Sequence, residues 1–292
     1  MDYQKWLRGY ENGLQGKTVV LFGATGGIGQ ALCRYILTLG GTLITVDRNK
    51  EKAAACTAAL RKEFPQGEIK NLFADLADAE SVKAVTKDLQ KLEIDLLVHN
   101  AGAYSIPRFT TALGLDNVFQ INFAAPYYIT KQLLPVLEKR QGRVVAVGSI
   151  AHTYSKSDPQ DTDFATRKKA SLVYGNAKRY LMYAFLELSK GHPEVSFSVT
   201  HPGITFTNIT AHYPKLIFAI IKHPMKVIFM PPRYAALSIV KGMFEATQPY
   251  SWIGPRIFDI WGSPKKKPLK TATATEIQRI FEKAQQLYDL WL

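Results

Sequence analysis

Short apolar runs alternate with longer amphipathic stretches over the first 200 residues of the chain. The apolar runs are nearly continuous and rich in Val, Ile and Leu, as expected of strands that are buried on both faces of a sheet. Candidate strands cover residues 18–22, 42–46, 69–73, 96–99, 143–147 and 196–200. Between them lie helical patterns such as 30–39, 51–64 and 80–92. This alternation predicts an α/β fold, a Rossmann-type doubly wound parallel sheet with helices on both faces.

The last ninety residues differ in character from the first 200. Residues 204–232 are apolar, aromatic and interrupted by prolines, which predicts short helices that cover a pocket. Thr273 and Glu276 have the spacing of a capping box ahead of an amphipathic helix, which we expect to dock on the core or on another subunit. The opening residues 1–14 are also amphipathic and predict an arm. No linker divides the chain, so we expect a single domain over 1–292, with a core at about 15–205 and the lid and C-terminal helices at about 204–292.

Composition narrows the class of protein. The 292 residues are 47% hydrophobic, enough to bury one large core. The longest apolar stretch, 216–230, contains lysines, a histidine and a proline, so we do not expect it to span a membrane. The sequence shows no secretory leader pattern, and Cys33 and Cys56 offer no disulfide framework or metal-ligand spacing. We therefore expect a cytoplasmic protein without a metal.

The formal net charge of +13 raises the question of an acidic partner. The basic residues are spread along the chain, with one dense run at 265–270. Because no nucleic-acid-binding module or aromatic-interleaved basic face is visible, we expect no nucleic-acid partner. A solvated basic surface is the plain interpretation. Attraction to phosphorylated substrates or peripheral contact with an anionic membrane is the alternative.

A glycine-rich segment, 23–29, lies between the first candidate strand and the helical pattern that follows it. Glycines allow the backbone to turn tightly and approach a phosphate, and the free N–H groups of a helix N-terminus favour negative charge. The spacing of these glycines differs from the G-x-G-x-x-G dinucleotide fingerprint. The strand–turn–helix context nevertheless predicts a pyrophosphate-binding turn. The candidate cofactor contacts in it are Gly23, Thr25, Gly27, Ile28 and Gly29.

Asp47, at the end of the second strand, is the residue that distinguishes NAD from NADP in this prediction. A carboxylate at this point can accept both ribose hydroxyl groups and repel a 2′-phosphate, which favours NAD. Arg48 follows directly and could instead pair with the phosphate of NADP. We expect NAD or NADP, with a preference for NAD. The alternative is that Asp47 and Arg48 form a surface ion pair.

Further cofactor contacts are expected where the third and fourth strands end. Asp75, followed by Leu76, could accept a hydrogen bond from an adenine amino group. Asn100, Ala101 and Gly102 are small or polar residues at which the backbone could pass beneath the cofactor, although Asn and Gly also end strands for structural reasons.

The catalytic candidates lie further along the chain. Tyr174 and Lys178 are one helical turn apart, so their side chains share a helix face. A neighbouring ammonium is expected to lower the phenol pKa toward neutrality and make it a usable general acid or base. Tyr127 and Lys131 have the same spacing. Only Tyr174 follows Ser149, which ends the fifth strand, and so can face the carboxyl edge of the sheet beside it.

These residues together resemble the short-chain dehydrogenase/reductase family. The resemblance covers about residues 15–205 and rests on the glycine segment, Asp75, Asn100–Gly102, Asn122, Ser149, Tyr174, Lys178 and Pro202–Gly203 in the family's order. It implies a sheet of about seven strands. It also implies reversible hydride transfer between a nicotinamide and a small-molecule alcohol or carbonyl, and we expect a homo-oligomer.

The resemblance also implies a role for each catalytic candidate. Tyr174 would exchange the proton with the substrate oxygen, and Ser149 would hydrogen-bond that oxygen as charge develops on it. Lys178 would hold the nicotinamide ribose, and Asn122 would kink its helix and hold a water in a proton relay. Pro202, Gly203 and Thr207 resemble the segment that fixes the carboxamide end of the nicotinamide.

Some positions depart from the family's pattern. Phe22, His99 and Gly148 stand where other residues are frequent, but no catalytic group is lost. The stretch between Ser149 and Tyr174 is longer than usual and carries Asp158, Asp161 and Asp163. This insertion and the His201-Pro-Gly203 sequence are similar to the retinol-dehydrogenase-like branch, where substrates are often lipophilic. A segment 204–232 that only covers the protein core would have the same apolar composition as one that binds a lipophilic substrate.

Two other functions fit parts of the pattern. A nucleotide-sugar epimerase or dehydratase would permit the glycine spacing, but such enzymes usually carry a larger C-terminal domain than the 114 residues after Lys178. A non-catalytic cofactor-sensing regulator or scaffold would keep the fold. A sensor has no chemical need for the complete set of Asn122, Ser149, Tyr174 and Lys178.

Overall fold

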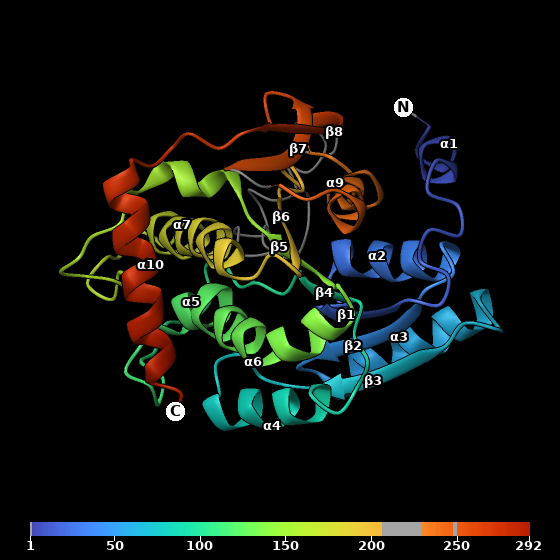
Figure 1. Ribbon diagram of the computed structural model, residues 1–292, viewed down its shortest axis with the longest axis horizontal. Helices are drawn as coiled ribbons and strands as arrows, with labels where there is room; N and C mark the ends of the chain where they lie inside the picture. The colour runs from blue at the N-terminus through green and yellow to red at the C-terminus, as the bar shows by residue number, and fades with distance from the viewer. Residues whose placement is uncertain (1, 206–228, 248–249) are drawn as a thin grey trace, which may run out of the picture.

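The computed structural model describes residues 2–205, 229–247 and 250–292. The predicted apolar cover at 204–232 and the candidate Thr207 fall mainly or wholly outside the described residues. Within them, helices and strands alternate along the chain as expected (Figure 1). The α-helices are α1 (Tyr3–Arg8), α2 (Gly27–Thr38), α3 (Lys50–Glu63), α4 (Ala79–Leu89), α5 (Asn117–Phe119), α6 (Ala125–Lys139), α7 (Ala170–Leu188), α9 (Pro232–Phe244) and α10 (Ala274–Asp289).

The strands form one sheet in the order β3-β2-β1-β4-β5-β6-β7-β8. All neighbours are parallel except β7 and β8, which form an antiparallel hairpin. The strands are β1 (Thr18–Phe22), β2 (Thr42–Asp47), β3 (Ile69–Phe73), β4 (Leu96–His99), β5 (Arg143–Val147), β6 (Ser196–Thr200), β7 (Ser251–Ile257) and β8 (Trp261–Pro268). The six strands predicted from the apolar runs are all present, and β2 extends one residue further, to Asp47.

The described residues form eight strands, one more than the approximately seven that the family resemblance implied. The extra strand, β8, contains the lysine run, for which a solvated basic surface was the plain interpretation. Lys265, Lys266 and Lys267 pair with Gly254, Ile253 and Trp252 across the hairpin. Lysines are tolerated at a sheet edge because their charged ends reach water and discourage further strands from pairing there.

Alternating strand residues divide the core into two layers. Val20 of β1 packs with α4, α6, α7 and α10 on one face, and Val19 packs with α2, α3 and α9 on the other. Because helices cover both faces, the strands are buried along their length, which explains their nearly continuous apolar sequence. The crossovers bring the carboxyl ends of the parallel strands to one edge, where ligands bind in this architecture.

Both chain ends pack on the domain. Tyr3 of the N-terminal arm contacts the rings of Tyr35 and Tyr234. At α10, Thr273 Oγ1 accepts a hydrogen bond from Glu276 N at 3.2 Å, as the capping-box spacing predicted. Figure 1 shows α10 lying across α5, α6 and α7, so the helix docks on the core of its own chain. Among the described residues no helix is long and apolar enough to cross a membrane.

Candidate active site

The glycine-rich turn joins β1 to α2 at the carboxyl edge of the sheet. Gly23 has a φ of +81°, and a Cβ there would lie 2.8 Å from Ala101 Cα. A Cβ on Gly29 would lie 2.0 Å from Gly23 O, so only glycine fits at this crossing of strand and helix. Gly26 caps α2 without a side-chain hydrogen bond, which leaves first-turn N–H groups available to a phosphate. Ile28 lies in that first turn and is half-buried.

Asp47 lies beside this turn. Its Oδ1 accepts hydrogen bonds from Thr25 N and Thr25 Oγ1, both at 3.0 Å, and the residue is only 4% exposed. Its Oδ2 is buried and has no hydrogen-bond partner among the described residues. Burial raises the carboxyl pKa, although the bonds from Thr25 oppose this effect. Asp47 therefore holds the glycine turn, and its carboxylate lies at the end of β2, where an acidic residue contacts the ribose in dinucleotide-binding folds of this kind.

The proposed surface pair of Asp47 and Arg48 does not form. Asp47 is buried against Thr25, whereas the exposed Arg48 approaches Asp75 Oδ2 at 3.9 Å. Asp75 Oδ1 accepts a hydrogen bond from Ala77 N at 3.0 Å, which turns the chain after β3. Leu76 is buried, and its carbonyl accepts a hydrogen bond from Gln120 Nε2 at 3.1 Å. These contacts set the backbone at this edge and leave Asp75 half-exposed.

The segment after β4 crosses beneath the glycine turn. Asn100 Nδ2 donates to Gly23 O at 2.9 Å and so connects the ends of β1 and β4. A Cβ on Gly102 would lie 2.7 Å from Asn122 Oδ1 and 3.5 Å from Lys178 Nζ. The sequence-predicted Gly102, Asn122 and Lys178 therefore meet at one point.

Asn122 lies in a π-helical turn, Gln120–Ala124, between α5 and α6. Its Nδ2 donates to the carbonyls of Ala103 and Val118, both at 2.8 Å, and its Oδ1 accepts from Ala103 N at 3.3 Å. A π turn is rare and marks functional sites. The predicted irregularity at Asn122 is present, and the side chain ties that irregularity to the segment following β4.

Tyr174, Lys178 and Ser149 converge at the same edge. Tyr174 and Lys178 lie on α7, one turn apart, and Ser149 follows β5 and forms a side-chain hydrogen bond with Tyr174. Lys178 Nζ lies 5.7 Å from the centroid of the Tyr174 ring and donates to Val147 O at 2.9 Å. The Tyr104 ring packs edge-on against Tyr174 with centroids 5.3 Å apart.

The electrostatics of this cluster differ from the sequence-based expectation. Burial raises the pKa of Tyr174 to about 12, although the bond with Ser149 opposes that rise. Burial also lowers the pKa of Lys178, which is 3% exposed, to about 7. The prediction that Lys178 draws the phenol pKa toward neutrality was wrong for this structure. Desolvation disfavours the charged form of both groups, and here it is the larger effect.

The competing Tyr127–Lys131 pair has a structural role. Tyr127 is buried in α6, and its hydroxyl accepts a hydrogen bond from Gln285 Nε2 at 2.6 Å. Lys131 Nζ donates to Gln285 Oε1 at 2.5 Å and lies over the Tyr288 ring. Both residues contact α10, whereas Tyr174 lies beside Ser149 and Lys178 at the carboxyl edge, as chain order predicted.

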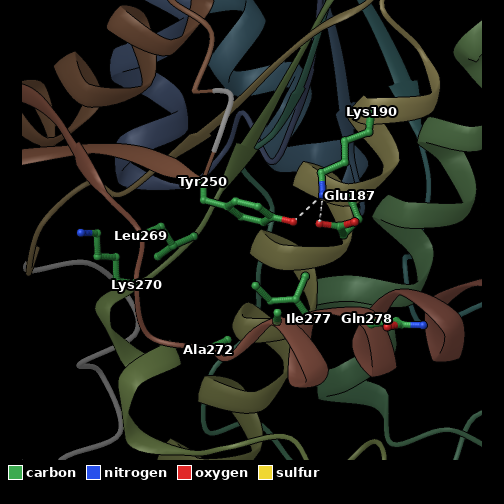
Figure 2. Close-up of a pocket in the computed structure, with 9 residues that line it drawn as sticks. Glu187, Lys190, Tyr250, Leu269, Lys270, Ala272, Ile277 and Gln278 are labelled. Atoms are coloured by element: carbon green, nitrogen blue, oxygen red, sulfur yellow. Dashed lines mark hydrogen bonds and ion pairs between the residues drawn. The ribbon is translucent and has the colours of Figure 1, made fainter.

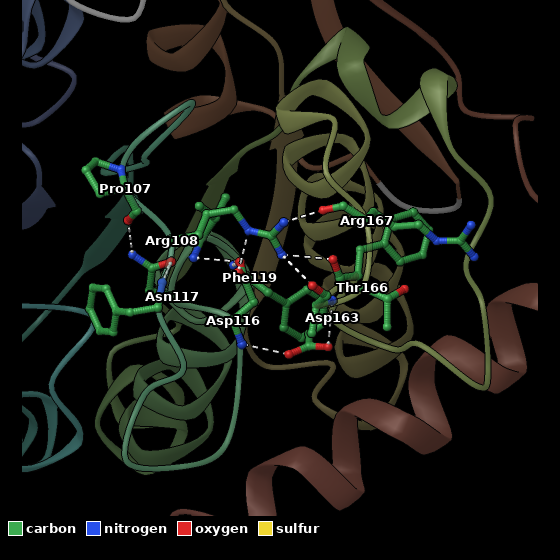
Figure 3. A network of polar contacts seen from close by, with 12 residues as sticks. Pro107, Arg108, Asp116, Asn117, Phe119, Asp163, Thr166 and Arg167 are labelled. Atoms are coloured by element: carbon green, nitrogen blue, oxygen red, sulfur yellow. Dashed lines mark hydrogen bonds and ion pairs between the residues drawn. The ribbon is translucent and has the colours of Figure 1, made fainter.

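The insertion between Ser149 and Tyr174 is held by a polar network (Figure 3). Asp163 Oδ2 accepts from Asp116 N at 2.6 Å, and Arg108 pairs with Asp116 Oδ2 at 2.7 Å. Arg167 pairs with Asp158 at 2.6 Å and with Asp161 at 3.3 Å. The three inserted aspartates therefore anchor the insertion, and the network joins it to the segment that leads into the π turn.

Sequence reasoning missed Arg179, His152 and Tyr104. Arg179 is buried and pairs with Glu276 of α10 at 2.7 Å, while its Nη1 donates to His152 O at 3.0 Å. His152 Nδ1 lies 2.7 Å from Ser149 O. Burial lowers the His152 pKa, so the neutral ring donates this bond. The sequence did offer one signal for Arg179: it is a second cation, directly after Lys178, in a helix that is otherwise largely apolar.

His99, one of the positions that differ from the family's usual pattern, is part of the core. It stacks on Phe22, its Nε2 lies 2.8 Å from Thr130 Oγ1, and burial lowers its pKa to about 3. The ring is therefore neutral at ordinary pH and takes no visible part in the site.

A cavity of about 630 Å³ lies elsewhere, between the C-terminal end of α7, the end of β8 and the start of α10 (Figure 2). Lys190 Nζ donates to Glu187 Oε1 and to the Tyr250 hydroxyl on its wall, both at 2.7 Å. Glu187 is roughly 20 Å along α7 from Tyr174, given the rise of 1.5 Å per residue. The cavity is therefore distinct from the catalytic cluster.

Comparisons with known proteins agree with this geometry. A sequence model described as short chain dehydrogenase matches residues 17–215. Mouse polyprenol dehydrogenase is 27% identical over 90% of this chain and 81% of its own length. Human retinol dehydrogenase 14 is 29% identical over 72% of this chain and 68% of its own length.

Solved structures support the fold. An uncharacterised protein from Mycobacterium paratuberculosis superposes with a TM-score of 0.76 at 22% identity, covering 94% of both chains. A short-chain dehydrogenase from Sphingobium yanoikuyae, solved with NADPH, has a TM-score of 0.56 at 26% identity and covers 67% of this chain and 74% of its own. The protein is an NAD(P)-dependent oxidoreductase acting on an alcohol or carbonyl group, and it belongs to the short-chain dehydrogenase family, in the retinol-dehydrogenase-like branch.

Proposed function

We propose that the protein interconverts a lipophilic alcohol and its carbonyl compound, with Tyr174 as the general acid and base. The convergence of Tyr174, Ser149, Lys178 and Asn122 beside the glycine turn carries this proposal. When bound, the nicotinamide dinucleotide supplies or accepts the hydride. Nothing in the comparisons favours the non-catalytic regulator.

The glycine turn and its neighbours fit a dinucleotide. Gly23 and Gly29 leave no room for a Cβ, and the N-terminus of α2 has no side-chain cap. A pyrophosphate would take the free N–H groups there. Lys178, beside Gly102 and Asn122, would hold the nicotinamide ribose. Pro202 and Gly203, directly after β6, would contact the carboxamide end.

We favour NAD over NADP. Asp47, at the end of β2 beside the glycine turn, would accept a ribose hydroxyl, and its carboxylate would repel a 2′-phosphate. Arg48, which is exposed and only loosely paired with Asp75, is the residue that would oppose this preference.

The proton chemistry follows from the burial of the site. Because the Tyr174 pKa is about 12, the phenol is protonated at neutral pH and can donate its proton to a carbonyl oxygen. Ser149 hydrogen-bonds the phenol and stands where it could also hydrogen-bond the substrate oxygen as negative charge develops on it. The protein is thus poised to reduce a carbonyl at neutral pH. Oxidation of an alcohol first requires the phenol to lose its proton.

Apolar surroundings of Tyr174 support a lipophilic substrate. Phe164 and Val173 are buried in a small cluster with Val118, against which Ile106 and Tyr174 pack. Phe164 comes from the insertion, which therefore contributes to the buried apolar cluster against which Tyr174 packs. Two of the relatives are named for polyprenol and retinol, both long apolar alcohols.

The cysteines indicate the cellular compartment. We place the protein in the cytoplasm because Cys33 and Cys56 are both free thiols, as reducing compartments favour.

A homo-oligomer would have to use a face other than the outer side of α6 and α7, since α10 covers that side. Sedimentation velocity measures the oligomeric state directly.

Steady-state nicotinamide absorbance tests the proposed reaction. Alcohols and aldehydes of increasing chain length are assayed with both cofactors. We expect kcat/KM to rise with apolar length and to favour NAD. Activity confined to short polar substrates would contradict the substrate class, and absence of turnover with every pair would contradict the reaction.

A further inference from the structure

The chain has two cysteines, and the fold brings them together. Cys33 lies in α2 and Cys56 in α3, two helices that pack next to each other on one face of the sheet (Figure 1). The helices are also connected by an ion pair between Arg34 Nε and Glu63 Oε2 at 2.7 Å. Cys33 directly precedes Arg34, and Cys56 lies about two turns before Glu63, so both thiols belong to the same contact between the helices.

Helix periodicity places each thiol at this contact. Cys33 shares a face of α2 with the buried Ile36 and is itself 0% exposed. Cys56 shares a face of α3 with the buried Ala53 and Leu60, but is only half-buried. Side chains three and four positions apart lie on the same side of a helix. One thiol is therefore enclosed in the core, and the other can be reached from solvent.

The two thiols are in direct contact and differ in reactivity. Cys33 donates a hydrogen bond to the sulfur of Cys56. This bond raises the pKa of Cys33, as burial also does, and it lowers the pKa of Cys56 although burial opposes it. Of the charged neighbours, Asp47 disfavours a thiolate at either position and Arg34 favours one. Because thiolates react with oxidants and thiols do not, Cys56 is the reactive member of the pair.

We propose that Cys33 and Cys56 form a dithiol that a hydroperoxide oxidises to a disulfide, and that the disulfide weakens binding of the dinucleotide. The Cys56 thiolate first attacks a peroxide oxygen. The O–O bond breaks, Cys56 becomes a sulfenic acid, and the other oxygen leaves as water or an alcohol with the proton that Cys56 had lost. The Cys33 sulfur then attacks the Cys56 sulfur, and the hydroxyl group leaves as water with the Cys33 proton. The pair loses two electrons and the peroxide gains them.

The contact between the thiols lies behind the cofactor-binding edge. Asp47 is close enough to influence both thiols, and only Arg48 and Asn49 separate it from α3. Asn49 caps that helix by accepting a hydrogen bond from Lys52 N at 2.7 Å. Since a covalent S–S bond is shorter than a hydrogen-bonded contact between two sulfurs, oxidation draws α2 and α3 together. The displacement reaches Asp47, whose bonds from Thr25 hold the glycine turn.

A metal site is a poorer interpretation of the two thiols. Protein zinc sites use three or four side-chain ligands. In the part of the chain that the structure describes, no three His, Cys, Asp or Glu side chains are grouped so that they could hold a metal ion. A pair of thiols in contact, one buried and one accessible, instead matches the chemistry of a reversible disulfide.

Thiol counting tests the oxidation without reference to activity. The full chain is treated with hydrogen peroxide and unfolded, and its free thiols are counted with a thiol-reactive dye. Non-reducing electrophoresis separates monomers from cross-linked dimers. Because the chain has no third cysteine, an intramolecular disulfide can only join Cys33 to Cys56. Cys56→Ser, at the half-buried position, is the matched control that keeps the buried thiol, and Cys33→Ser removes the thiol that resolves the sulfenic acid.

We expect the wild type to lose both thiols while remaining a monomer, and dithiothreitol to restore them. Cys56→Ser should keep its Cys33 thiol at the same peroxide dose. Cys33→Ser should accumulate a sulfenic acid at Cys56, detected by mass spectrometry as its dimedone adduct.

Fluorescence titration with the dinucleotide measures the coupling. Oxidation should raise the dissociation constant of the wild type about fivefold or more, and should leave that of Cys56→Ser unchanged. Coupling between two sites is reciprocal. Saturating dinucleotide should therefore shift the equilibrium between dithiol and disulfide, measured in a dithiothreitol redox buffer, toward the dithiol by the same factor. The effect on affinity rests on the dinucleotide binding at the glycine turn, whereas the oxidation does not.

Several results would overturn the proposal. Two free thiols in the peroxide-treated wild type would do so, as would their loss only through cross-linked dimers. Loss of the Cys33 thiol in Cys56→Ser as fast as in the wild type would refute the order of the two steps. A disulfide that leaves the dissociation constant unchanged would refute the coupling. Absence of turnover by the reduced protein, with the dithiol behaving as described, would reject the proposed reaction alone.

Discussion

Replacing Glu276 with Gln should destabilise the protein far more than its distance from the catalytic cluster suggests. Glu276 is buried, accepts hydrogen bonds from Arg179 Nε and Nη2 at 2.7 Å, and also accepts from Ser157 N and Oγ at 2.9 Å. Burial alone would raise the carboxyl pKa, but the bonds from Arg179 and Ser157 outweigh it, so the pKa is lowered. The amide would leave the buried guanidinium without a counter-charge.

The size of the effect follows from the burial of the pair. Breaking a buried ion pair by removing one partner costs about 3–5 kcal/mol. The unfolding entropy expected for a chain of 292 residues converts this to a fall in Tm of about 5–8 °C. Arg179→Met combined with Glu276→Leu removes both charges and should recover part of the loss, because no unpaired charge remains.

Urea unfolding followed by circular dichroism measures these differences. Glu282→Gln on the exposed face of the same helix is the matched control and should change stability by less than about 0.5 kcal/mol. Arg179 also bonds His152 O, and His152 contacts Ser149 O, so Glu276→Gln should lower kcat as well. A cost for Glu276→Gln no larger than that for Glu282→Gln would refute the reasoning.

Two further predictions concern the cofactor and the proton. Asp47→Ala should weaken binding of both dinucleotides, because Thr25 loses its acceptor. It should also shift the ratio of NAD to NADP affinity by about tenfold or more toward NADP. An unchanged ratio in fluorescence titrations would show that Asp47 does not contact the ribose. Because the folded-state pKa of Tyr174 is about 12, kcat/KM for alcohol oxidation should rise up to about tenfold per pH unit above neutrality, while the protonated phenol needed for carbonyl reduction stays populated. A shared pH profile for the two directions would contradict this assignment.

Much of the sheet could be predicted because its parallel strands are buried on both faces. The run 143–147 is apolar at every position after Arg143, and the structure has the same bounds. The hairpin strands carry Gly254, Pro255 and Pro264, which disfavour strand structure locally. β7 and β8 form because they pair with each other and with β6, a tertiary effect that no local pattern shows.

The site was predictable where chain order and topology suffice. The carboxyl edge of a parallel sheet gathers the residues that follow its strands, and this selected Tyr174 over Tyr127. The pairing of Arg179 with Glu276 spans 97 positions and has no local signature. The direction of the Tyr174 pKa shift also required the structure, because burial is a property of the packed molecule.

Turnover by Tyr174→Phe tests the central claim most directly, with Tyr127→Phe as the matched control. Loss of the phenol hydroxyl should lower kcat by about 10²–10⁴-fold, the usual contribution of a positioned acid or base, while leaving the dissociation constant for the dinucleotide nearly unchanged. Tyr127→Phe should keep kcat within about twofold and lose only the bond from Gln285. A Tyr174→Phe enzyme that turns over at the wild-type rate would contradict the account.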